Sequence, residues 1–306
     1  MNDTTFGAVV VLYHPDASVV NNIRKLIQQL DYLVVVDNSE EKNENHHILL
    51  ELYNEYKYKV RYIYLGLNLG IAEAMNIGCK FLIEEKMKFI LTFDQDTALT
   101  KDYVTSIYES YNELSKYDQI GIVGPKIIDV NSEGCSQKYF TILSKWRFKF
   151  EKLYQDRSDL GFVISSGSLI PSSVMLDVGL FRSEFFIDGV DVEYCLRLKI
   201  NNYRVAYSDR AQILHSMGEK SIHNIMGKKI VTSNHSDIRR YYMIRNSIYI
   251  ISEYGVKLPF LFVFYFGVHV NNLIRIMFFE RNRSSKIKYS ILGFWHGIKG
   301  IKGKLK

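Results

Sequence analysis

The chain lacks the signals of several common protein classes. Its three cysteines, Cys79, Cys135 and Cys195, are too widely spaced for a disulfide framework or a zinc site, which favours a reducing compartment. The N-terminus shows no basic stretch followed by an apolar one, so we expect no secretory signal and a cytoplasmic body. No strand is followed by G-x-G-x-x-G, and no G-x-x-x-x-G-K-[ST] occurs, which disfavours a dinucleotide-dependent dehydrogenase and a P-loop nucleotidase.

Excess positive charge is also absent from most of the chain. The net charge is +6, but residues 255–306 contain ten Lys or Arg and one acid, Glu280, for a local charge of +9. The first 254 residues therefore carry −3. A nucleic-acid binder normally carries a basic stripe across its folded body, so we expect no nucleic-acid partner.

What the sequence does contain is an alternation of apolar runs and amphipathic segments. Short apolar runs predict buried strands at 6–12, 32–36, 60–65, 89–93 and 120–123. Helical spacing predicts helices at 18–30, 48–56, 71–85 and 100–114. This alternation is typical of an α/β protein with a mostly parallel sheet and helices on both faces. Polar turns after the strands should then gather at one edge of the sheet and form a cleft.

The second half is less regular. Residues 129–159 are polar and aromatic, and we expect an irregular connection there. Order should return over 162–170, followed by the elements that the pattern predicts at 191–200 (helix), 204–207 and 213–215 (strands) and from 239 (a long aromatic helix).

Asp94-Gln95-Asp96 directly follows the apolar run 89–93. Two carboxylates one residue apart at the end of a buried strand can hold a hard divalent cation, whose coordination is completed by substrate phosphates. The alternative is that Asp96 caps the next helix and Asp94 is a solvated loop residue.

Polar residues also end the two preceding strands. Asp37 could accept a hydrogen bond from the imide N–H of uracil or thymine, or it could simply form an Asx-turn with Asn38 and Ser39. Asn68 and Gly70 precede a helix whose N-terminus could bind an anion, although a capped loop would place the same residues there.

Acids recur beside large apolar residues over 185–193. Asp188 and Asp191 are candidates for a general base, because burial raises the pKa of a carboxylate toward the working range. An Asp at a helix start can instead be an N-cap. Glu193 and Arg197 are four residues apart and could pair along the helix.

Two further residues have open interpretations. His215 follows a short apolar run and is either structural or, if it lies near Asp96, a ligand suited to manganese-like ions. Arg245 belongs to a basic aromatic stretch, 239–246, that could meet a pyrophosphate, contact a membrane surface, or form a solvated basic face.

In this order, the segments resemble family 2 glycosyltransferases of the GT-A fold. More narrowly, they resemble the bacterial rhamnosyltransferases that build O-antigen and other cell-wall polysaccharides. The resemblance covers 6–303 and is most specific over 186–197, with a further similar stretch at 293–300. It implies a single Rossmann-like sheet, divided into a nucleotide-sugar-binding half (1–125) and an acceptor-binding half with the catalytic base (126–254), followed by a helical membrane-associating tail (255–306).

The resemblance also implies roles for residues. Asp37 would bind the base of the nucleotide and Asp94 would lie near the ribose. Asp96 would hold Mg²⁺ or Mn²⁺ on the diphosphate, and His215 would help to hold the metal or the diphosphate. Asp191 would be the general base.

The remaining assignments are less direct. Glu193 would have a supporting role, while Asn68, Gly70 and Arg245 would contact the donor. Many relatives in the wider family carry Glu-Asp where this chain has Val190-Asp191, so we expect Asp188 to share the work of the base.

The implied reaction is transfer of L-rhamnose from dTDP-β-L-rhamnose to a hydroxyl of a lipid-linked saccharide, with inversion at C1 to an α linkage. The alternatives are the same fold with a UDP-hexose or galactofuranose donor, or a non-catalytic membrane-bound scaffold.

The C-terminal tail begins with a very apolar stretch. Residues 258–279 are about long enough to span a bilayer, but His269, Asn271, Asn272 and Arg275 interrupt them. We therefore expect a helix lying in the membrane interface, with residues 281–306 on anionic lipid. This would place the protein peripherally on the cytoplasmic face of the bacterial inner membrane. The alternative is a buried helix in a homo-oligomer.

Overall fold

The computed structural model describes residues 4–42, 46–129, 138–215, 221–225, 228–232 and 234–305. The chain forms two compact units. The first unit comprises residues 1–141, 150–183 and 190–216, and the second comprises 142–149, 184–189 and 217–306. We describe each unit by itself.

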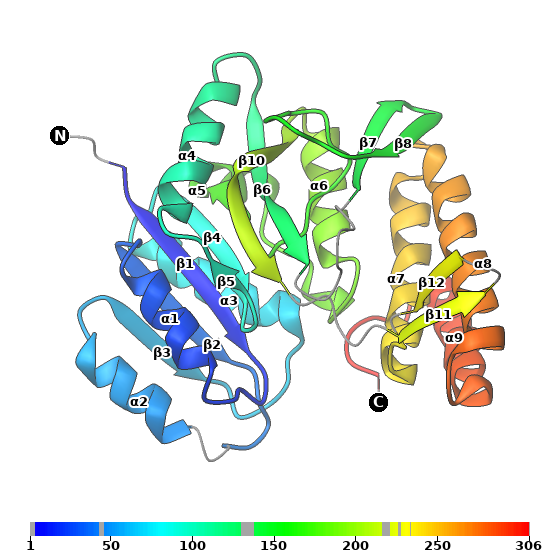
Figure 1. The fold of residues 1–306 in the computed structure, drawn as a ribbon, viewed down its shortest axis with the longest axis horizontal. Coiled ribbons are helices and arrows are strands. Elements are labelled where there is room, and N and C mark those ends of the chain that lie inside the picture. Colours follow the sequence, from blue (N-terminus) through cyan, green and yellow to red (C-terminus); the bar gives the residue numbers. More distant parts are fainter. Residues whose placement is uncertain are drawn as a thin grey trace. The chain divides into compact units, whose positions relative to one another are not determined.

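An eight-stranded sheet forms the centre of the first unit (Figure 1). Its strand order is β3-β2-β1-β4-β9-β6-β10-β5. The strands are β1 (Phe6–Leu12), β2 (Tyr32–Asp37), β3 (Val60–Tyr64), β4 (Phe89–Asp94), β5 (Ala98–Leu99), β6 (Ile120–Asp129), β9 (Leu169–Pro171) and β10 (Arg204–His215). β3, β2, β1 and β4 are parallel, as are β6 and β10, whereas β9 runs antiparallel to both β4 and β6. The α/β class and the mostly parallel sheet expected from the sequence are thus confirmed.

Helices cover both faces of this sheet. They are α1 (Val19–Ile27), α2 (His46–Glu55), α3 (Ile71–Glu84), α4 (Tyr103–Leu114), α5 (Ser172–Val178) and α6 (Val190–Ile200). Ala8, Val10 and Leu12 of β1 share one core with α1, α2 and α4. On the opposite face, α3 contacts β1 so closely that a Cβ at Gly78 would lie 2.5 Å from a methyl of Val9. The period-two side-chain alternation of a strand explains this division between two faces.

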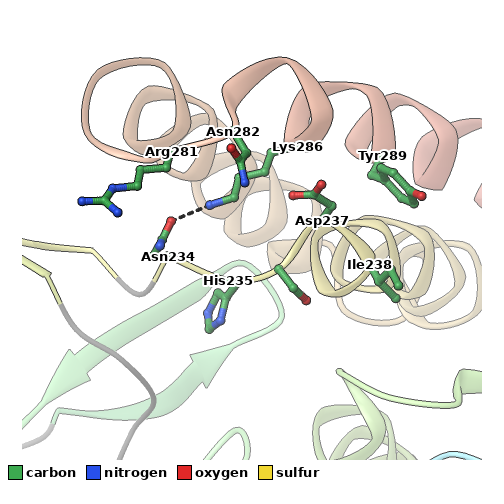
Figure 2. Close-up of a pocket in the computed structure, with 9 residues that line it drawn as sticks. Asn234, His235, Asp237, Ile238, Arg281, Asn282, Lys286 and Tyr289 are labelled. Atoms are coloured by element: carbon green, nitrogen blue, oxygen red, sulfur yellow. Dashed lines mark hydrogen bonds between the residues drawn. The ribbon is translucent and has the colours of Figure 1, made fainter.

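Three long helices dominate the second unit: α7 (Asp237–Tyr254), α8 (Phe260–Phe279) and α9 (Arg283–Lys299). A two-stranded sheet, β11 (Ser221–Ile225) with β12 (Lys228–Thr232), precedes them. A polar pocket of about 450 Å³ lies where α7 and α9 begin, with Asn234, His235, Asp237 and Lys286 among its lining residues (Figure 2). In the described part of the chain, α8 is the one helix long and apolar enough to cross a membrane.

The structure corrects several sequence-based expectations. Part of the segment expected to be irregular, 129–159, forms a hairpin of β7 (Tyr139–Ser144) and β8 (Arg147–Glu151). The strands expected at 204–207 and 213–215 are one strand, β10, with an irregularity between Tyr207 and Gln212. β6 continues through residue 125, and α7 belongs to the second unit together with α8 and α9; the division of the chain at 125 and 254 stays a prediction.

Candidate active site

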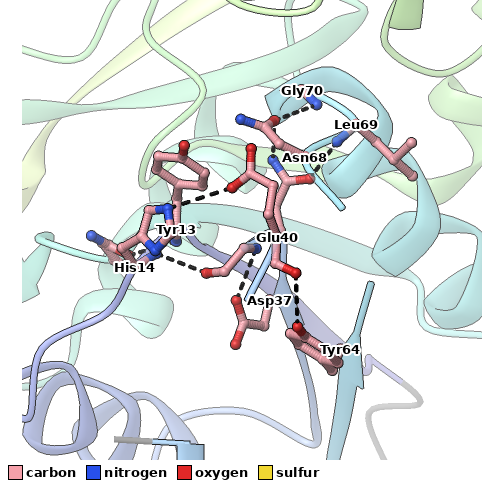
Figure 3. A network of polar contacts seen from close by, with 11 residues as sticks. Tyr13, His14, Asp37, Glu40, Tyr64, Asn68, Leu69 and Gly70 are labelled. Atoms are coloured by element: carbon pink, nitrogen blue, oxygen red, sulfur yellow. Dashed lines mark hydrogen bonds and ion pairs between the residues drawn. The ribbon is translucent and has the colours of Figure 1, made fainter. Parts of the chain in front are cut away.

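The loops after β1, β2, β3 and β4 are joined by hydrogen bonds at one edge of the sheet. Asn38 is the hub: its Nδ2 donates to Asn68 Oδ1 at 3.1 Å, and its Oδ1 accepts from Leu69 N at 2.8 Å. Asn68 Oδ1 also accepts from Gly70 N at 2.9 Å (Figure 3). The expected gathering of polar turns at the carboxyl ends of the strands is therefore present.

Gly70 is the residue that leads this network into α3. Its φ of 85° lies in the region that side chains with a Cβ rarely adopt. Gly70 stands at the N-cap position of α3, and its N–H donates to Asn68, so the capped-loop interpretation describes these contacts. The N-terminus of α3 is thereby fixed against the strand ends, and donor binding by Asn68 and Gly70 stays a prediction.

Asp37 ends β2 and is 3% exposed. Its Oδ1 accepts from Ser39 N at 3.1 Å, which is the Asx-turn that the sequence left open, and its Oδ2 accepts from Tyr62 Oη at 2.8 Å. Burial raises the pKa of Tyr62, and its hydrogen bond to the carboxylate raises it further, so Tyr62 remains a donor at neutral pH. Asp37 is thus oriented by fixed partners, and its contact with a base stays a prediction.

The loop 94–97 is held by a residue far away in the sequence. Ser166 Oγ accepts from Asp94 N at 3.0 Å and lies 2.6 Å from Thr97 Oγ1. Thr97 N also donates to Asp94 O at 3.2 Å, closing a turn around Asp96. Asp96 lies exposed at the tip of this turn. The two carboxylates therefore offer hard oxygen atoms on a fixed backbone, a donor set that suits Mg²⁺ or Mn²⁺ when phosphate oxygens complete it.

Gln95, between the two aspartates, ties this loop to its neighbours. Its Oε1 accepts from Tyr13 N at 2.8 Å, and its backbone carbonyl accepts from Asn22 Nδ2 at 3.4 Å. His14, the residue after Tyr13, lies in the chain that follows β1, and its N–H donates to Ser39 Oγ at 2.8 Å. The chain after β1 is therefore bonded both to the Asp94 loop and to the Asp37 loop.

Asp191 lies in the first turn of α6, where its Oδ1 accepts from Val192 N at 2.9 Å. Two residues later, Glu193 is fully buried and forms a bidentate pair with Arg197, with both N···O distances 3.0 Å. Arg197 also donates to the carbonyls of Val178 and Leu180. Glu193 thus pairs along the helix with an arginine that anchors α6 to the end of α5 and the loop after it, and its supporting role in catalysis stays a prediction.

A single short segment, residues 163–166, contacts both α6 and the Asp94 loop. Cys195 Sγ lies 3.8 Å from the carbonyl oxygen of Val163. Three residues further on, Ser166 holds Asp94. Three residues span at most about 11 Å of chain, so the middle of α6, at Cys195, and the aspartate loop are held by the two ends of one short segment.

Asp188 belongs to the second unit, whereas Asp191 belongs to the first. Arg239 Nε lies 3.0 and 3.2 Å from the two carboxylate oxygens of Asp188. Burial raises the pKa of the Asp188 carboxyl above its ordinary value, although the charge of Arg239 opposes this rise. Asp188 therefore has a cationic partner of its own, and its sharing of the base role stays a prediction.

The segment 184–189 is held in an unusual backbone conformation by α7. Phe186 and Asp188 have φ values of 65° and 63°, which side chains rarely adopt. Asn246 Nδ2 lies 3.0, 2.8 and 2.7 Å from the carbonyl oxygens of Phe185, Ile187 and Asp188, respectively. One asparagine thus fixes the backbone that leads directly to α6.

Arg245 differs from its expected role at the donor. It is fully buried, and its guanidinium donates to the carbonyls of Glu184, Phe185 and Gly303 and to Asn246 Oδ1. Its charge also lies over the rings of Tyr241, Tyr242 and Tyr249. This correction has a simple physical reason: the donors of the guanidinium are used inside the second unit, where they fix segment 184–189 and the C-terminal residues.

The C-terminal residues 301–305 lie across the same segment. Gly303 N donates to Glu184 O at 2.8 Å, and Leu305 N donates to Tyr242 Oη at 2.7 Å. Lys304 lies 6.0 Å from the ring centre of Phe186. Residues 301–305 and α7 therefore hold segment 184–189 together.

For the remaining candidate, His215, the structure describes only the backbone. It is the last residue of β10, in register with Asp129 of β6, and its side chain lies outside the described part of the chain. Among the described side chains, no three His, Cys, Asp or Glu residues are grouped as a metal site.

Sequence reasoning missed Ser166, Gln95, Tyr62 and Asn246. Each acts through contacts with residues distant in sequence, and a serine or asparagine carries no sequence signal for such a contact. A signal existed only for Gln95, which stands inside the acidic motif.

The sequence profile described as "Glycosyl transferase family 2" matches residues 8–178, which include the linked strand-end loops, the aspartate motif and Ser166. The chain belongs to glycosyl transferase family 2.

This family 2 glycosyltransferase is 32% identical over 313 residues to the dTDP-rhamnosyl transferase RfbF of Shigella flexneri, an alignment that covers 99% of this chain and 98% of that protein. The family assignment made from the sequence is thereby confirmed.

Two solved structures have the same fold at low identity. The crystal structure of S. aureus TarS 1-349 superposes with a TM-score of 0.61 and 14% identity, covering 96% of this chain and 81% of that one. The crystal structure of GalNAc-T7 with UDP, GalNAc and Mn²⁺ gives a TM-score of 0.60 at 13% identity, covering 82% of this chain and 48% of that one. The GT-A fold expected for this glycosyltransferase is confirmed.

Proposed function

We propose that this glycosyltransferase transfers L-rhamnose from dTDP-β-L-rhamnose to a hydroxyl of a lipid-linked saccharide in surface-polysaccharide synthesis. The observation that carries the proposal is the end-to-end similarity, at 32% identity, to a dTDP-rhamnosyl transferase. The ordered strand-end loops and Asp191 at the start of α6 support it.

The proposed chemistry is a single displacement at C1 of the sugar. Asp191 takes the proton of the acceptor hydroxyl as its oxygen attacks C1, while the C1–O bond to the diphosphate breaks with oxocarbenium character. The attack comes from the face opposite the leaving group, so a β-linked donor gives an α-linked product. Asp37 and its partner Tyr62 would receive the thymine edge, and Asp94 would lie at the ribose.

A divalent cation fits the donor set of the aspartate loop. Asp96, exposed at the tip of the turn, and Asp94 would hold Mg²⁺ or Mn²⁺ together with diphosphate oxygens, and His215 is the proposed additional ligand. When bound, the ion stabilises the charge that develops on the leaving diphosphate. Ser166 and Gln95 keep the backbone of the loop in place for this task.

Membrane attachment is the second part of the proposal. α8 exposes a row of large apolar side chains, including Phe262, Val263, Phe266 and Phe278, and residues 255–306 carry a charge of +9. This combination favours a helix in the interface of an anionic bilayer, at the cytoplasmic face of the inner membrane.

A donor panel tests the proposal. The protein is incubated with dTDP-L-rhamnose, UDP-glucose, UDP-galactofuranose and UDP-GlcNAc, each with and without Mn²⁺, and thermal stabilisation is measured. We expect the largest increase in Tm with dTDP-L-rhamnose plus metal, and transfer from that donor alone. A larger response to a UDP-sugar would replace the donor, and no response to any nucleotide sugar would favour the non-catalytic scaffold.

A further inference from the structure

The second unit contains an apolar groove of about 440 Å³ between α7, α8 and α9. Its walls are formed by Ile244, Phe266, Val270, Leu273, Ile276 and Ile291. Phe266 is 72% exposed and Ile291 is 54% exposed, so the groove is continuous with the apolar surface of α8 and α9. A volume in this range is typical of small-molecule sites, which are mostly about 300–1,000 Å³.

A buried arginine lines this apolar groove. Arg240 is 3% exposed, and its Nη2 donates to Glu280 Oε1 at 2.5 Å. Within the described part of the chain, its Nε and Nη1 are buried and have no hydrogen-bond partner. Buried donors without partners are costly, so they indicate a ligand that accepts hydrogen bonds.

The charge around Arg240 favours an anion. Glu280 is shared by Arg240 and Lys286, whose Nζ lies 2.9 Å from Glu280 Oε2, so this buried triad has a net charge of +1. Lys286 also donates to Asn234 in the polar pocket where α7 and α9 begin (Figure 2). Two further charges have opposite effects on Arg240: Arg275 lowers its pKa and Asp188 raises it. One acid therefore balances only one of the two cations, and the second charge remains to be neutralised.

We propose that this groove binds the hydrocarbon chain of a phosphate-bearing membrane lipid, with the phosphate accepting hydrogen bonds from Arg240 Nε and Nη1. Apolar walls and unsatisfied cationic donors in one groove match an amphiphile that has both parts. Free phosphate would leave the apolar walls uncovered, and the apolar face of a second copy of this chain would leave the arginine donors unsatisfied. The inference rests on the proposed function in one respect: the lipid would be the carrier of the acceptor saccharide.

Lipid binding can be measured without transfer. The full chain in mild detergent is titrated with dioleoyl phosphatidic acid or dioleoyl phosphatidylcholine, and adducts are counted by native mass spectrometry in the presence and absence of millimolar inorganic phosphate. We expect one phosphatidic acid per chain, bound about tenfold more tightly than phosphatidylcholine and not displaced by inorganic phosphate.

Two variants separate the groove from the general apolar surface. Ser290→Trp fills the groove, because Ser290 lines it, and should weaken phosphatidic acid binding about tenfold. Ser284→Trp adds the same side chain at an exposed position of α9 and should bind as the wild type does. Arg240→Lys keeps the charge beside Glu280 but removes the guanidinium fork, so it should abolish the preference for phosphatidic acid over phosphatidylcholine.

The outcomes distinguish the inference from the proposed function. Unchanged lipid binding in Ser290→Trp would overturn the inference, as would a dimer that this variant dissociates while lipid binding stays the same. Rhamnose transfer to a lipid-free saccharide tests the proposed function separately, and Ser290→Trp should retain it. If the wild type and the variants bind lipid but none of them transfers rhamnose, the proposed function is wrong and the lipid site remains supported.

Discussion

Replacing Asn246 by alanine should destabilise the protein and slow transfer together. The side chain is 1% exposed, and its two amide hydrogens serve the carbonyls of Phe185, Ile187 and Asp188 while its oxygen accepts from Arg245 Nε at 3.0 Å. Two lost neutral hydrogen bonds and one lost acceptor for a buried guanidinium sum to about 3–5 kcal/mol of unfolding free energy. Because the φ values of Phe186 and Asp188 are positive, the freed segment should relax toward ordinary backbone conformations and move the residues that lead to Asp191.

Thermal unfolding and transfer kinetics measure the two effects. Asn201→Ala is the matched control, because Asn201 is exposed directly after α6 and its side chain donates to Arg197 O at 2.8 Å. We expect the control to stay within about 0.5 kcal/mol of the wild type. We expect Asn246→Ala to lower Tm and, at temperatures where it is fully folded, to lower kcat. Unchanged Tm and kcat in Asn246→Ala would refute the reasoning that this asparagine holds the segment.

Four other perturbations test separate parts of the molecule. Asp191→Asn should lower kcat by about 10²–10⁴-fold and leave nucleotide binding by calorimetry unchanged, whereas full transfer would remove Asp191 from the base role. Ser166→Ala should cost about 1–2 kcal/mol of stability and raise the KM for the donor, because Asp94 N and Thr97 lose their shared partner. The control Ser168→Ala removes a hydrogen bond to Ile164 O and should leave this KM unchanged. Burial and the charges of Arg239, Arg240 and Lys286 lower the pKa of His235 to about 4. Between about pH 6.5 and 4 the folded state therefore binds fewer protons than the unfolded state. The free energy of unfolding should fall by up to about 3 kcal/mol as pH drops through this window. His235→Asn should flatten that part of the pH–stability curve, and an identical curve would refute the assignment. Lys288→Gln with Lys299→Gln, both exposed on α9, should weaken binding to phosphatidylglycerol-containing vesicles by about 25-fold at about 1 kcal/mol per lysine, whereas Lys57→Gln with Lys116→Gln in the first unit should not change it.

Much of the first unit could be predicted because local pattern and tertiary environment agree there. The run 6–12 became β1 with the expected bounds, and the helices expected at 71–85 and 191–200 differ from α3 and α6 by one residue at one end. The strand-end residues Asp37, Asn68 and Asp94 were found because parallel strands bring their carboxyl ends to one edge. The roles of these residues in donor binding remain predictions.

The features that escaped prediction depend on contacts between distant segments. Order was expected over 162–170, but its form was not: the regular strand β9 begins only at Leu169, because Gly167 (φ 81°) turns the chain so that Ser166 meets the Asp94 loop. The hairpin of β7 and β8 lies in a stretch with mixed polarity and no clear period. Arg245 was expected to contact the donor because sequence alone gives no sign of the three aromatic rings and three backbone carbonyls that surround it.

The contacts of residues 301–305 with segment 184–189 have a consequence for the timing of folding. Gly303 N donates to Glu184 O of this segment, and Leu305 N donates to Tyr242 Oη of α7; both residues are synthesised long after the segment. A growing chain could form the parallel sheet early, yet it could not make the contact between Gly303 and this segment until residue 303 had left the ribosome. We therefore expect nascent chains to bind nucleotide before they are able to transfer sugar, because segment 184–189 is held in full only after the C-terminal residues have been synthesised.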